Sequence, residues 1–409
     1  MPVAVYVLGA AVFALGTSEF MLSGLLPDVA DDLDVSIPTA GLLISAFAIG
    51  MVVGAPLLAA ATQRLPRRQA LLGLLAVFGA GHVVGAVAPG YALLFACRVI
   101  SALACAGFWA VGTAVAISLV SADARARAMA VMLGGLSIAN IAGVPAGALL
   151  GQHLGWRSAF WAVALLTALG LAGVLAFVPR GVGARDAARR PRLRAELVMY
   201  RDRQVWLAIG TIAFFAAGTF CFFSYLAPLL TDVTGLGEGW VPVVLVLYGI
   251  GALTGTLVGG RLADRHMFGT LYTGLGAATA ALALIALTAR NPVAVVALSG
   301  LLGLAAFVGA PALNARIFVL AGAAAPTLAG ATVTSAFNTG NTIGPWAGGV
   351  VISVGLGYAW TAGLGALLVL AALAGAWLQD REARRGSRAV AGGRPFAGAL
   401  PRKKVSTQS

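Results

Sequence analysis

The chain is poor in charge, in lysine and in cysteine. Only 10% of its 409 residues are charged, against about 25% in soluble domains. Its two lysines, Lys403 and Lys404, stand near the end of the chain, so no phosphate-binding Gly-Lys-Ser/Thr loop exists. The three cysteines, Cys97, Cys105 and Cys221, lie in apolar runs, where we expect neither disulfides nor a metal site. There is no Gly-x-Ser-x-Gly elbow either. We therefore expect no enzyme, no cofactor and no ATP-driven pump.

Long apolar blocks dominate what remains, since 60% of the residues are hydrophobic. About 20 apolar residues cross a bilayer as a helix. Blocks of this kind predict an all-α membrane protein with twelve transmembrane helices, at residues 4–26, 39–61, 70–88, 92–119, 128–150, 157–178, 204–230, 240–260, 268–289, 293–320, 327–352 and 357–378.

Basic segments divide these helices into two bundles of six. Residues 1–178 form the first bundle and 204–379 the second, joined by an Arg-rich linker at 179–203. The basic tail at 380–409 is low in apolar content, and we expect no fixed structure there.

The basic residues also predict orientation. Of 27 Lys and Arg residues, 24 fall in segments on one side of the membrane, two (Arg157 and Arg290) on the other, and Arg98 within a helix. Under the positive-inside rule both termini lie in the cytoplasm of a multi-pass protein of the cell membrane. The net charge of +13 therefore reflects contact with the lipid bilayer, and we expect no nucleic-acid partner.

An internal repeat relates the two bundles. A shift of 201 residues superimposes residues of rarer types at corresponding helix positions, namely Ser23 on Ser224, Pro27 on Pro228, Arg64 on Arg265 and Asn140 on Asn341. Two related halves are typical of transporters that rock around a central site.

Two motifs carry a resemblance to the major facilitator superfamily, along nearly the whole chain. The loop Gly260-Arg261-Leu262-Ala263-Asp264-Arg265 keeps the family's cytoplasmic gate pattern, whereas its first-half copy keeps Arg64 but has Gln63 where the family has Asp. Gly340 to Gly349, with Gly344-Pro345, matches the family's antiporter motif, and helix 5 has the looser Gly143-Val144-Pro145. The resemblance implies gating roles for Arg64, Asp264, Arg265, Gly143, Pro145, Gly344 and Pro345. Positive-inside flanking and ordinary helix packing are the alternatives.

Within that superfamily the chain is most similar to twelve-helix drug:proton antiporters. The segments Phe13–Met21, Leu65–Arg68 and Leu94–Ile100 carry this likeness. They resemble actinobacterial chloramphenicol-resistance exporters and, less closely, bacterial sugar-efflux permeases. The resemblance implies export of a drug in exchange for protons. Sugar efflux, and more distantly a channel or structural membrane protein, remain as alternatives.

Glu19 is the candidate for proton coupling, because it is the only acid well within a predicted span. Arg98 lies at a matched depth in helix 4 and is its natural partner, although it could instead hold backbone carbonyls or substrate oxygens. A purely structural ion pair is the alternative for both. His82 in helix 3 is a weaker candidate, with a packing role expected.

A mixed aromatic, hydroxyl and amide cavity is predicted for the substrate. Its candidate residues share helix faces with Glu19 and Arg98 or are repeat partners: Ser23, Trp109, Asn140, Phe220, Ser224 and Asn341. Such a lining suits a neutral, amphipathic aromatic drug. Each aromatic has lipid-facing or core packing as its alternative. We expect the drug and protons to be the partners of a monomer.

Overall fold

The computed structural model describes residues 1–62, 65–181, 197–322 and 326–391, and every regular element in these ranges is a helix. The all-α prediction is therefore confirmed. The longer helices are α1 (Val3–Phe20), α3 (Ile37–Ala61), α4 (Arg67–Ala86), α5 (Tyr91–Ser118), α6 (Arg125–Ile138), α7 (Val144–Leu154), α8 (Arg157–Phe177), α10 (Arg203–Phe223), α12 (Trp240–Leu287), α13 (Pro292–Ala321), α14 (Pro326–Ser353) and α15 (Ala359–Ala391).

Short helical pieces extend three of these spans. A 3₁₀ turn, η1 (Met21–Gly24), continues α1, and α2 (Leu26–Asp32) follows it. A π turn, η4 (Ala139–Gly143), joins α6 to α7, so these three pieces make one crossing. After α10 come α11 (Leu226–Pro228) and the π turn η7 (Leu229–Val233).

The described helices account for the twelve predicted spans. Ten of them are long and apolar enough to cross a membrane. One of these, α12, has 48 residues and a non-helical backbone at His266, so it holds two crossings. The remaining span is α14, which is 28 residues long but more polar than the others.

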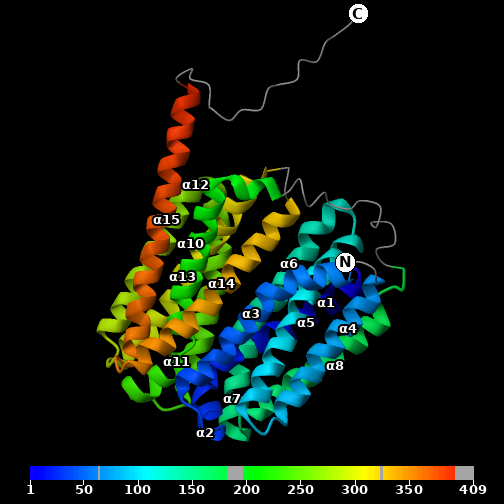
Figure 1. The fold of residues 1–409 in the computed structure, drawn as a ribbon, viewed down its shortest axis with the longest axis vertical. Coiled ribbons are helices and arrows are strands. Elements are labelled where there is room, and N and C mark those ends of the chain that lie inside the picture. The colour runs from blue at the N-terminus through cyan, green and yellow to red at the C-terminus, as the bar shows by residue number, and fades with distance from the viewer. Residues whose placement is uncertain (63–64, 182–196, 323–325, 392–409) are drawn as a thin grey trace, which may run out of the picture.

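The spans form two bundles that lie side by side (Figure 1). The first holds α1 and α3 to α8, and the second holds α10 and α12 to α15. One apolar core lies mainly in each bundle, although Val144 and Ala148 of α7 pack into the second core and Tyr225 into the first. Both described ends of the chain lie at one end of the molecule, here called the termini end, and α2 and α11 lie at the other, the α2 end.

The two halves related by the sequence repeat also share the same close helix contacts at corresponding glycines. A Cβ atom at Gly143 would contact Thr17 of α1, and one at Gly344 would contact backbone atoms of Ala217 in α10. The crossing made of α6, η4 and α7 thus packs on α1 as α14 packs on α10. Small residues at these positions let the backbones approach closely.

Most hydroxyl groups of α14 are satisfied by its own backbone. Four threonine hydroxyls donate to the carbonyl four residues earlier, as in Thr342 to Asn338 at 2.8 Å, and the others are Thr332, Thr334 and Thr339. Asn338 Nδ2 also donates to the Thr334 carbonyl, at 3.0 Å. Back-bonding of this kind removes donors that lipid could not satisfy.

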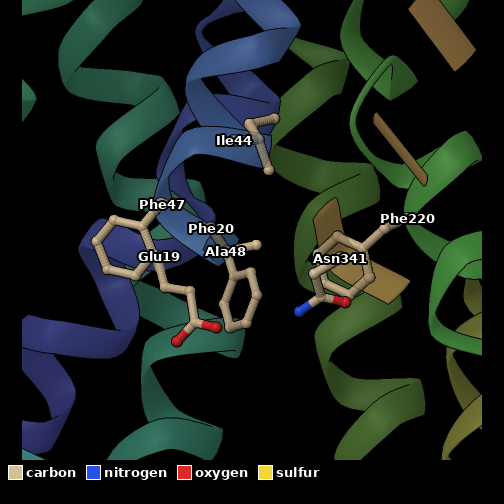
Figure 2. Close-up of a pocket in the computed structure, with 7 residues that line it drawn as sticks. All are labelled: Glu19, Phe20, Ile44, Phe47, Ala48, Phe220 and Asn341. Atoms are coloured by element: carbon tan, nitrogen blue, oxygen red, sulfur yellow. The ribbon is translucent and has the colours of Figure 1, made fainter. Parts of the chain in front are cut away.

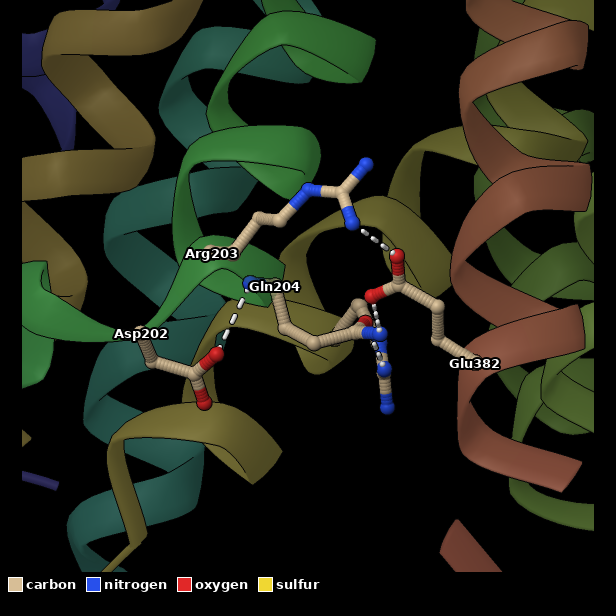
Figure 3. Close-up of polar contacts among 5 residues, drawn as sticks. Asp202, Arg203, Gln204 and Glu382 are labelled. Carbon is tan, nitrogen blue, oxygen red and sulfur yellow. Dashed lines mark hydrogen bonds and ion pairs between the residues drawn. The ribbon is translucent and has the colours of Figure 1, made fainter. Parts of the chain in front are cut away.

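The C-terminal tail is more ordered than expected, since α15 continues to Ala391. The expectation of no fixed structure from residue 380 is therefore wrong for 380–391, while 392–409 lie outside the described residues. Polar contacts hold the first turn of this extension, and Figure 3 shows those of Glu382. Glu382 pairs with Arg203 at 2.8 Å and accepts a hydrogen bond from Gln204 Nε2. Arg384 pairs with Asp380 one turn away.

Arg316 also differs from expectation. The count of 24 basic residues on one side of the membrane includes it, but it lies within α13 and is 7% exposed. Its guanidinium donates to Gln204 Oε1 at 2.8 Å and to Gln379 Oε1 at 3.3 Å, and Gln379 in turn donates to Thr211 Oγ1. Neutral amides on α10 and α15 thus solvate this buried cation.

The two bundles are joined from the middle of the molecule to the α2 end. Ser45 Oγ of α3 donates to the Thr342 carbonyl of α14 at 2.8 Å. Closer to the α2 end, Gln152 Nε2 donates to the Glu238 carbonyl at 2.8 Å, and a Cβ at Gly41 would meet the Tyr225 ring. Among the described residues, no hydrogen bond or ion pair joins the bundles nearer the termini end. This conformation is therefore closed at the α2 end.

Candidate functional site

A pocket between the two bundles contains Glu19. Figure 2 shows Glu19 and Phe20 of α1 facing Phe220 of α10 and Asn341 of α14. Ile44, Phe47 and Ala48 of α3 complete the lining. The rings of Phe20 and Phe220 meet at 5.5 Å between centroids. One carboxyl and one amide thus face each other in an aromatic enclosure.

The pocket is nearly collapsed in this conformation. Its free volume is about 10 Å³, which is room for about one water molecule. Drug-sized ligands need about 300–1,000 Å³. A ligand can therefore enter only when the bundles move apart and the Phe20–Phe220 contact opens.

Arg98 of α5 lies behind this pocket. Its side chain is 1% exposed, and its guanidinium carbon is 4.3 Å from the centre of the Phe47 ring. One terminal nitrogen donates to both the backbone carbonyl and Oγ of Ser18, each at 3.0 Å. The remaining Nε and Nη2 have no hydrogen-bond partner.

Glu19 and Arg98 are neighbours without a direct ion pair. They interact electrostatically, but no contact within 4.0 Å joins them among the described residues. Of the roles left open by the sequence, the backbone-carbonyl contact is the one this conformation contains. The charge on Arg98 is therefore available to a carboxylate that moves toward it.

His82 of α4 extends the polar contacts around Arg98. Its Nε2 lies 2.6 Å from Ser18 Oγ, and its Nδ1 lies 2.7 Å from the Phe78 carbonyl. The ring also packs on Phe78 and Phe160, at 4.3 and 5.7 Å between centroids. The imidazole thus packs in the core, as expected, and joins a hydrogen-bonded chain as well.

The structure brings only part of the predicted substrate set into the pocket. Phe220 and Asn341 line it, and Asn341 Oδ1 is buried without a partner. Ser23 and Ser224 are fully buried, with their hydroxyls also unpartnered. Trp109 is half-buried against the first core and does not line the pocket.

Asn140 lies in the π turn η4 rather than in the pocket lining. Its backbone approaches α12, because a Cβ at Gly249 would lie 2.8 Å from the Asn140 carbonyl oxygen. π turns inside helices often mark functional positions. Here the turn η4 lies where the first bundle meets α12 of the second bundle.

The predicted gate residues divide into packed and exposed groups. Pro145 is buried at the start of α7, directly after Gly143 and Val144. Pro345 lies within α14, and its carbonyl accepts a hydrogen bond from the Tyr225 hydroxyl at 2.7 Å. By contrast, Asp264 and Arg265 are exposed and pair with no other described residue. Arg64 lies outside the described residues.

Acidic residues from both bundles meet at the α2 end. Partial burial raises the pKa of Asp28 above its ordinary value, and the neighbouring charges of Glu238 and Asp31 raise it further. Glu238 belongs to the second bundle and Asp28 to the first. The closed α2 end therefore brings like charges together, and their repulsion opposes closure at neutral pH.

Sequence reasoning missed the α3 side of the pocket and the role of Ser18. Ile44, Phe47 and Ala48 are ordinary apolar residues of a helix, and no sequence signal separates a cavity-lining Phe from a core Phe. Ser18 did carry a signal, because it directly precedes Glu19. A buried serine beside a buried acid is a candidate for a shared hydrogen-bond network.

Comparison with known proteins agrees with this architecture. The family model described as Major Facilitator Superfamily matches residues 8–332. The "Chloramphenicol resistance protein" of Streptomyces lividans is 44% identical, over 89% of this chain and 93% of its own length. The "Inner membrane transport protein YdhP" of Escherichia coli K12 is 38% identical, over 90% and 94%.

Solved transporters share the fold at low identity. A bacterial homolog of the human lysosomal transporter Spinster, in an inward-facing and occupied conformation, matches with a TM-score of 0.75 and 16% identity, over 93% of this chain and 96% of its own. A peptide transporter POT in complex with alafosfalin also gives 0.75, at 14% identity, over 95% and 96%. The described fold and the family match lead to one assignment: the chain belongs to the Major Facilitator Superfamily.

Proposed function

We propose that this transporter exports a small amphipathic antibiotic, with chloramphenicol as the first candidate, in exchange for protons. The observation that carries the proposal is the carboxyl of Glu19 in the pocket between the bundles, opposite Phe220 and Asn341. A titratable group at this place can respond to ligand and to bundle movement together. The 44% identity to a chloramphenicol resistance protein supports the choice of drug.

The mechanism follows from the closed α2 end. With both termini in the cytoplasm of the cell membrane, this conformation faces inward. Glu19 loses its proton to the cytoplasm, and its carboxylate turns toward the free donors of Arg98. The bundles then move further apart, so that the drug enters between Phe20 and Phe220. When the bundles rock outward, Glu19 takes up a proton and the drug leaves. A monomer contains all of these groups.

The gate residues work at the opposite end in this scheme. Asp264 and Arg265, exposed here, form their contacts when the termini end closes, together with Arg64. The glycine and proline motif at Gly143–Pro145 lets η4 and α7 slide on α1 during the exchange. The motif at Gly344–Pro345 lets α14 slide on α10 in the same way.

The test is drug-dependent proton movement in reconstituted vesicles. Addition of chloramphenicol to the wild type should release protons, and Glu19→Gln should abolish both this release and uphill export. Downhill drug exchange should survive in this variant, because glutamine mimics the protonated acid. One charge across about 100 mV supplies roughly 2.3 kcal/mol, enough for a drug gradient of about fifty-fold.

Cells give the complementary measurement. Expressing cells should accumulate less labelled chloramphenicol, and a protonophore should restore accumulation. Chemically altered drug in the medium would refute export as the cause of resistance. Proton release on addition of a sugar, with none on addition of the drug, would instead identify sugar efflux.

A further inference from the structure

Hydrogen-bond chemistry assigns donors along the chain behind the pocket. The Phe78 carbonyl can only accept, so His82 carries a hydrogen on Nδ1. Arg98 can only donate, so Ser18 Oγ accepts from it. A second buried cation beside Arg98 would be repelled, so the imidazole is neutral and its Nε2 is an acceptor. The Ser18 hydroxyl hydrogen then points to His82 Nε2.

This arrangement fixes one side of Arg98 and leaves the other free. The terminal nitrogen that donates to Ser18 is held by two hydrogen bonds, and the guanidinium plane is held against Phe47. Nε and Nη2 remain buried without partners. Unpaired donors on a buried cation are costly, so an acceptor is expected to use them at some stage of the cycle.

Glu19 is the acceptor that fits. It directly follows Ser18 on α1, and the electrostatic partners of Arg98 are Glu19 and Cys105. The charged group that interacts with His82 is Arg98 itself. The neighbouring helices α3 and α8 contribute the uncharged rings of Phe47 and Phe160.

We propose that His82, acting through Ser18, orients Arg98 so that its free donors receive the carboxylate of Glu19, and thereby sets the pH at which the transporter releases its proton. His82 is a positioning residue and carries no transported proton. A protonated His82 would turn Nε2 into a donor, break the bond from Ser18 and place a second cation beside Arg98. This inference rests on the proposed function, because it assigns Glu19 the exchanged proton.

The test compares three variants of the full-length protein. His82→Phe keeps a ring between Phe78 and Phe160 but removes the acceptor for Ser18. Ser18→Ala removes the same bond from the other side, together with the hydrogen bond that Arg98 donates to Ser18 Oγ. His82→Gln keeps an acceptor and a donor but cannot titrate near neutral pH. The probe is the infrared carbonyl band of the protonated Glu19 carboxyl, identified by its loss in Glu19→Gln and titrated without drug.

We expect the band to titrate at higher pH in His82→Phe and Ser18→Ala, by about one pH unit, or tenfold in proton affinity. The double variant should shift no further than Ser18→Ala alone, because that change already removes the Ser18–His82 bond. His82→Gln should restore the wild-type midpoint and release as many protons per drug molecule as the wild type. An unshifted midpoint in all variants would overturn the proposal, as would fewer protons released by His82→Gln.

The infrared titration separates this inference from the proposed function. If wild-type vesicles release no protons on addition of drug, the proposed function fails. The infrared titration midpoint of Glu19 is measured without drug, so it still tests whether His82 influences Glu19. A variant that does not fold is recognised by loss of its monodisperse peak in gel filtration. His82→Phe and Ser18→Ala then serve as independent substitutes for one another.

Discussion

The repeat-related glycines at positions 143 and 344 should respond differently to the same substitution. In Gly344→Ala the new Cβ would lie 2.5 Å from the Ala217 carbonyl oxygen and 2.9 Å from the Cys221 nitrogen. Both are backbone atoms of α10, and real Cβ contacts are essentially never under 3.0 Å. Helices α10 and α14 must therefore move apart by at least about 0.5 Å, the difference between 2.5 and 3.0 Å.

Gly143→Ala meets a side chain instead. The atoms nearest to its Cβ all belong to Thr17, whose Cβ lies at 3.0 Å and whose hydroxyl is closer. The hydroxyl can turn away at the loss of its 2.8 Å bond to the Phe13 carbonyl. That loss costs about 0.5–1.5 kcal/mol, whereas overpacking against a rigid backbone costs about 1–3 kcal/mol. Gly344→Ala should be the more destabilising change.

Thermal unfolding in detergent measures the difference. All three cysteines are buried, so a thiol-reactive fluorescent dye reports exposure of the core. Each kcal/mol should lower the midpoint by about 2–4 °C for a bundle of this size. Gly276→Ala is the matched control, because nothing lies within 4 Å of its Cβ, and it should be neutral or stabilising by up to about 1 kcal/mol.

A second substitution makes the reasoning refutable. Thr17→Ala should rescue Gly143→Ala, because it removes the hydroxyl that the new methyl group meets. No single side-chain truncation on α10 should rescue Gly344→Ala. Equal midpoints for the two glycine variants, or a failure of Thr17→Ala to rescue, would show that the packing described at these helix pairs is not what limits stability.

Two further changes test the ends of the molecule. Asp28→Asn should raise the unfolding midpoint at neutral pH, because it removes the cost of burying a charge and the repulsion from Glu238. Since the pKa of Asp28 is raised, this gain should be full above that pKa and disappear as the pH falls from it to the ordinary pKa of an aspartate; a gain independent of pH would contradict the argument. At the termini end, Gln379→Leu removes an acceptor from Arg316 and a donor to Thr211. It should lower stability by about 1.5–3 kcal/mol, which denaturation of the purified protein checks, and an unchanged midpoint would mean that water replaces the amide.

The bundle architecture could be predicted because lipid imposes strong rules on sequence. Blocks of apolar residues, basic flanks and the 201-residue repeat each follow from the cost of placing polar groups in hydrocarbon. The break of α12 at His266 also falls between two predicted blocks, at 240–260 and 268–289. By contrast, nothing in the composition of 380–391 predicted a continued helix. The contacts that hold its first turn are made by Glu382 with Arg203 and Gln204, which lie far away in the chain.

The candidate site was predictable only at its rarest residues. Glu19 and Arg98 stand out because charge is scarce in the spans, and the structure places them close together. The aromatic lining could not be predicted, because phenylalanine side chains occur both in the apolar core and in the lining of the pocket. Trp109 shares a face with Arg98 by helical spacing, yet that face is packed against the first core. Spacing fixes which residues share a face but not what covers it.

The polarity of α14 has a consequence for biogenesis. A span with two buried asparagines and four back-bonded threonines partitions poorly into lipid by itself. Its partners α3 and α10 are both synthesised earlier. Their surfaces are therefore available for packing when α14 leaves the ribosome. Insertion of this helix is then coupled to its docking on both bundles, because α3 belongs to the first and α10 to the second. A chain that ends before residue 326 would keep the contacts between α7 and α12 but lose the hydrogen bond from Ser45 to Thr342 in the middle of the molecule.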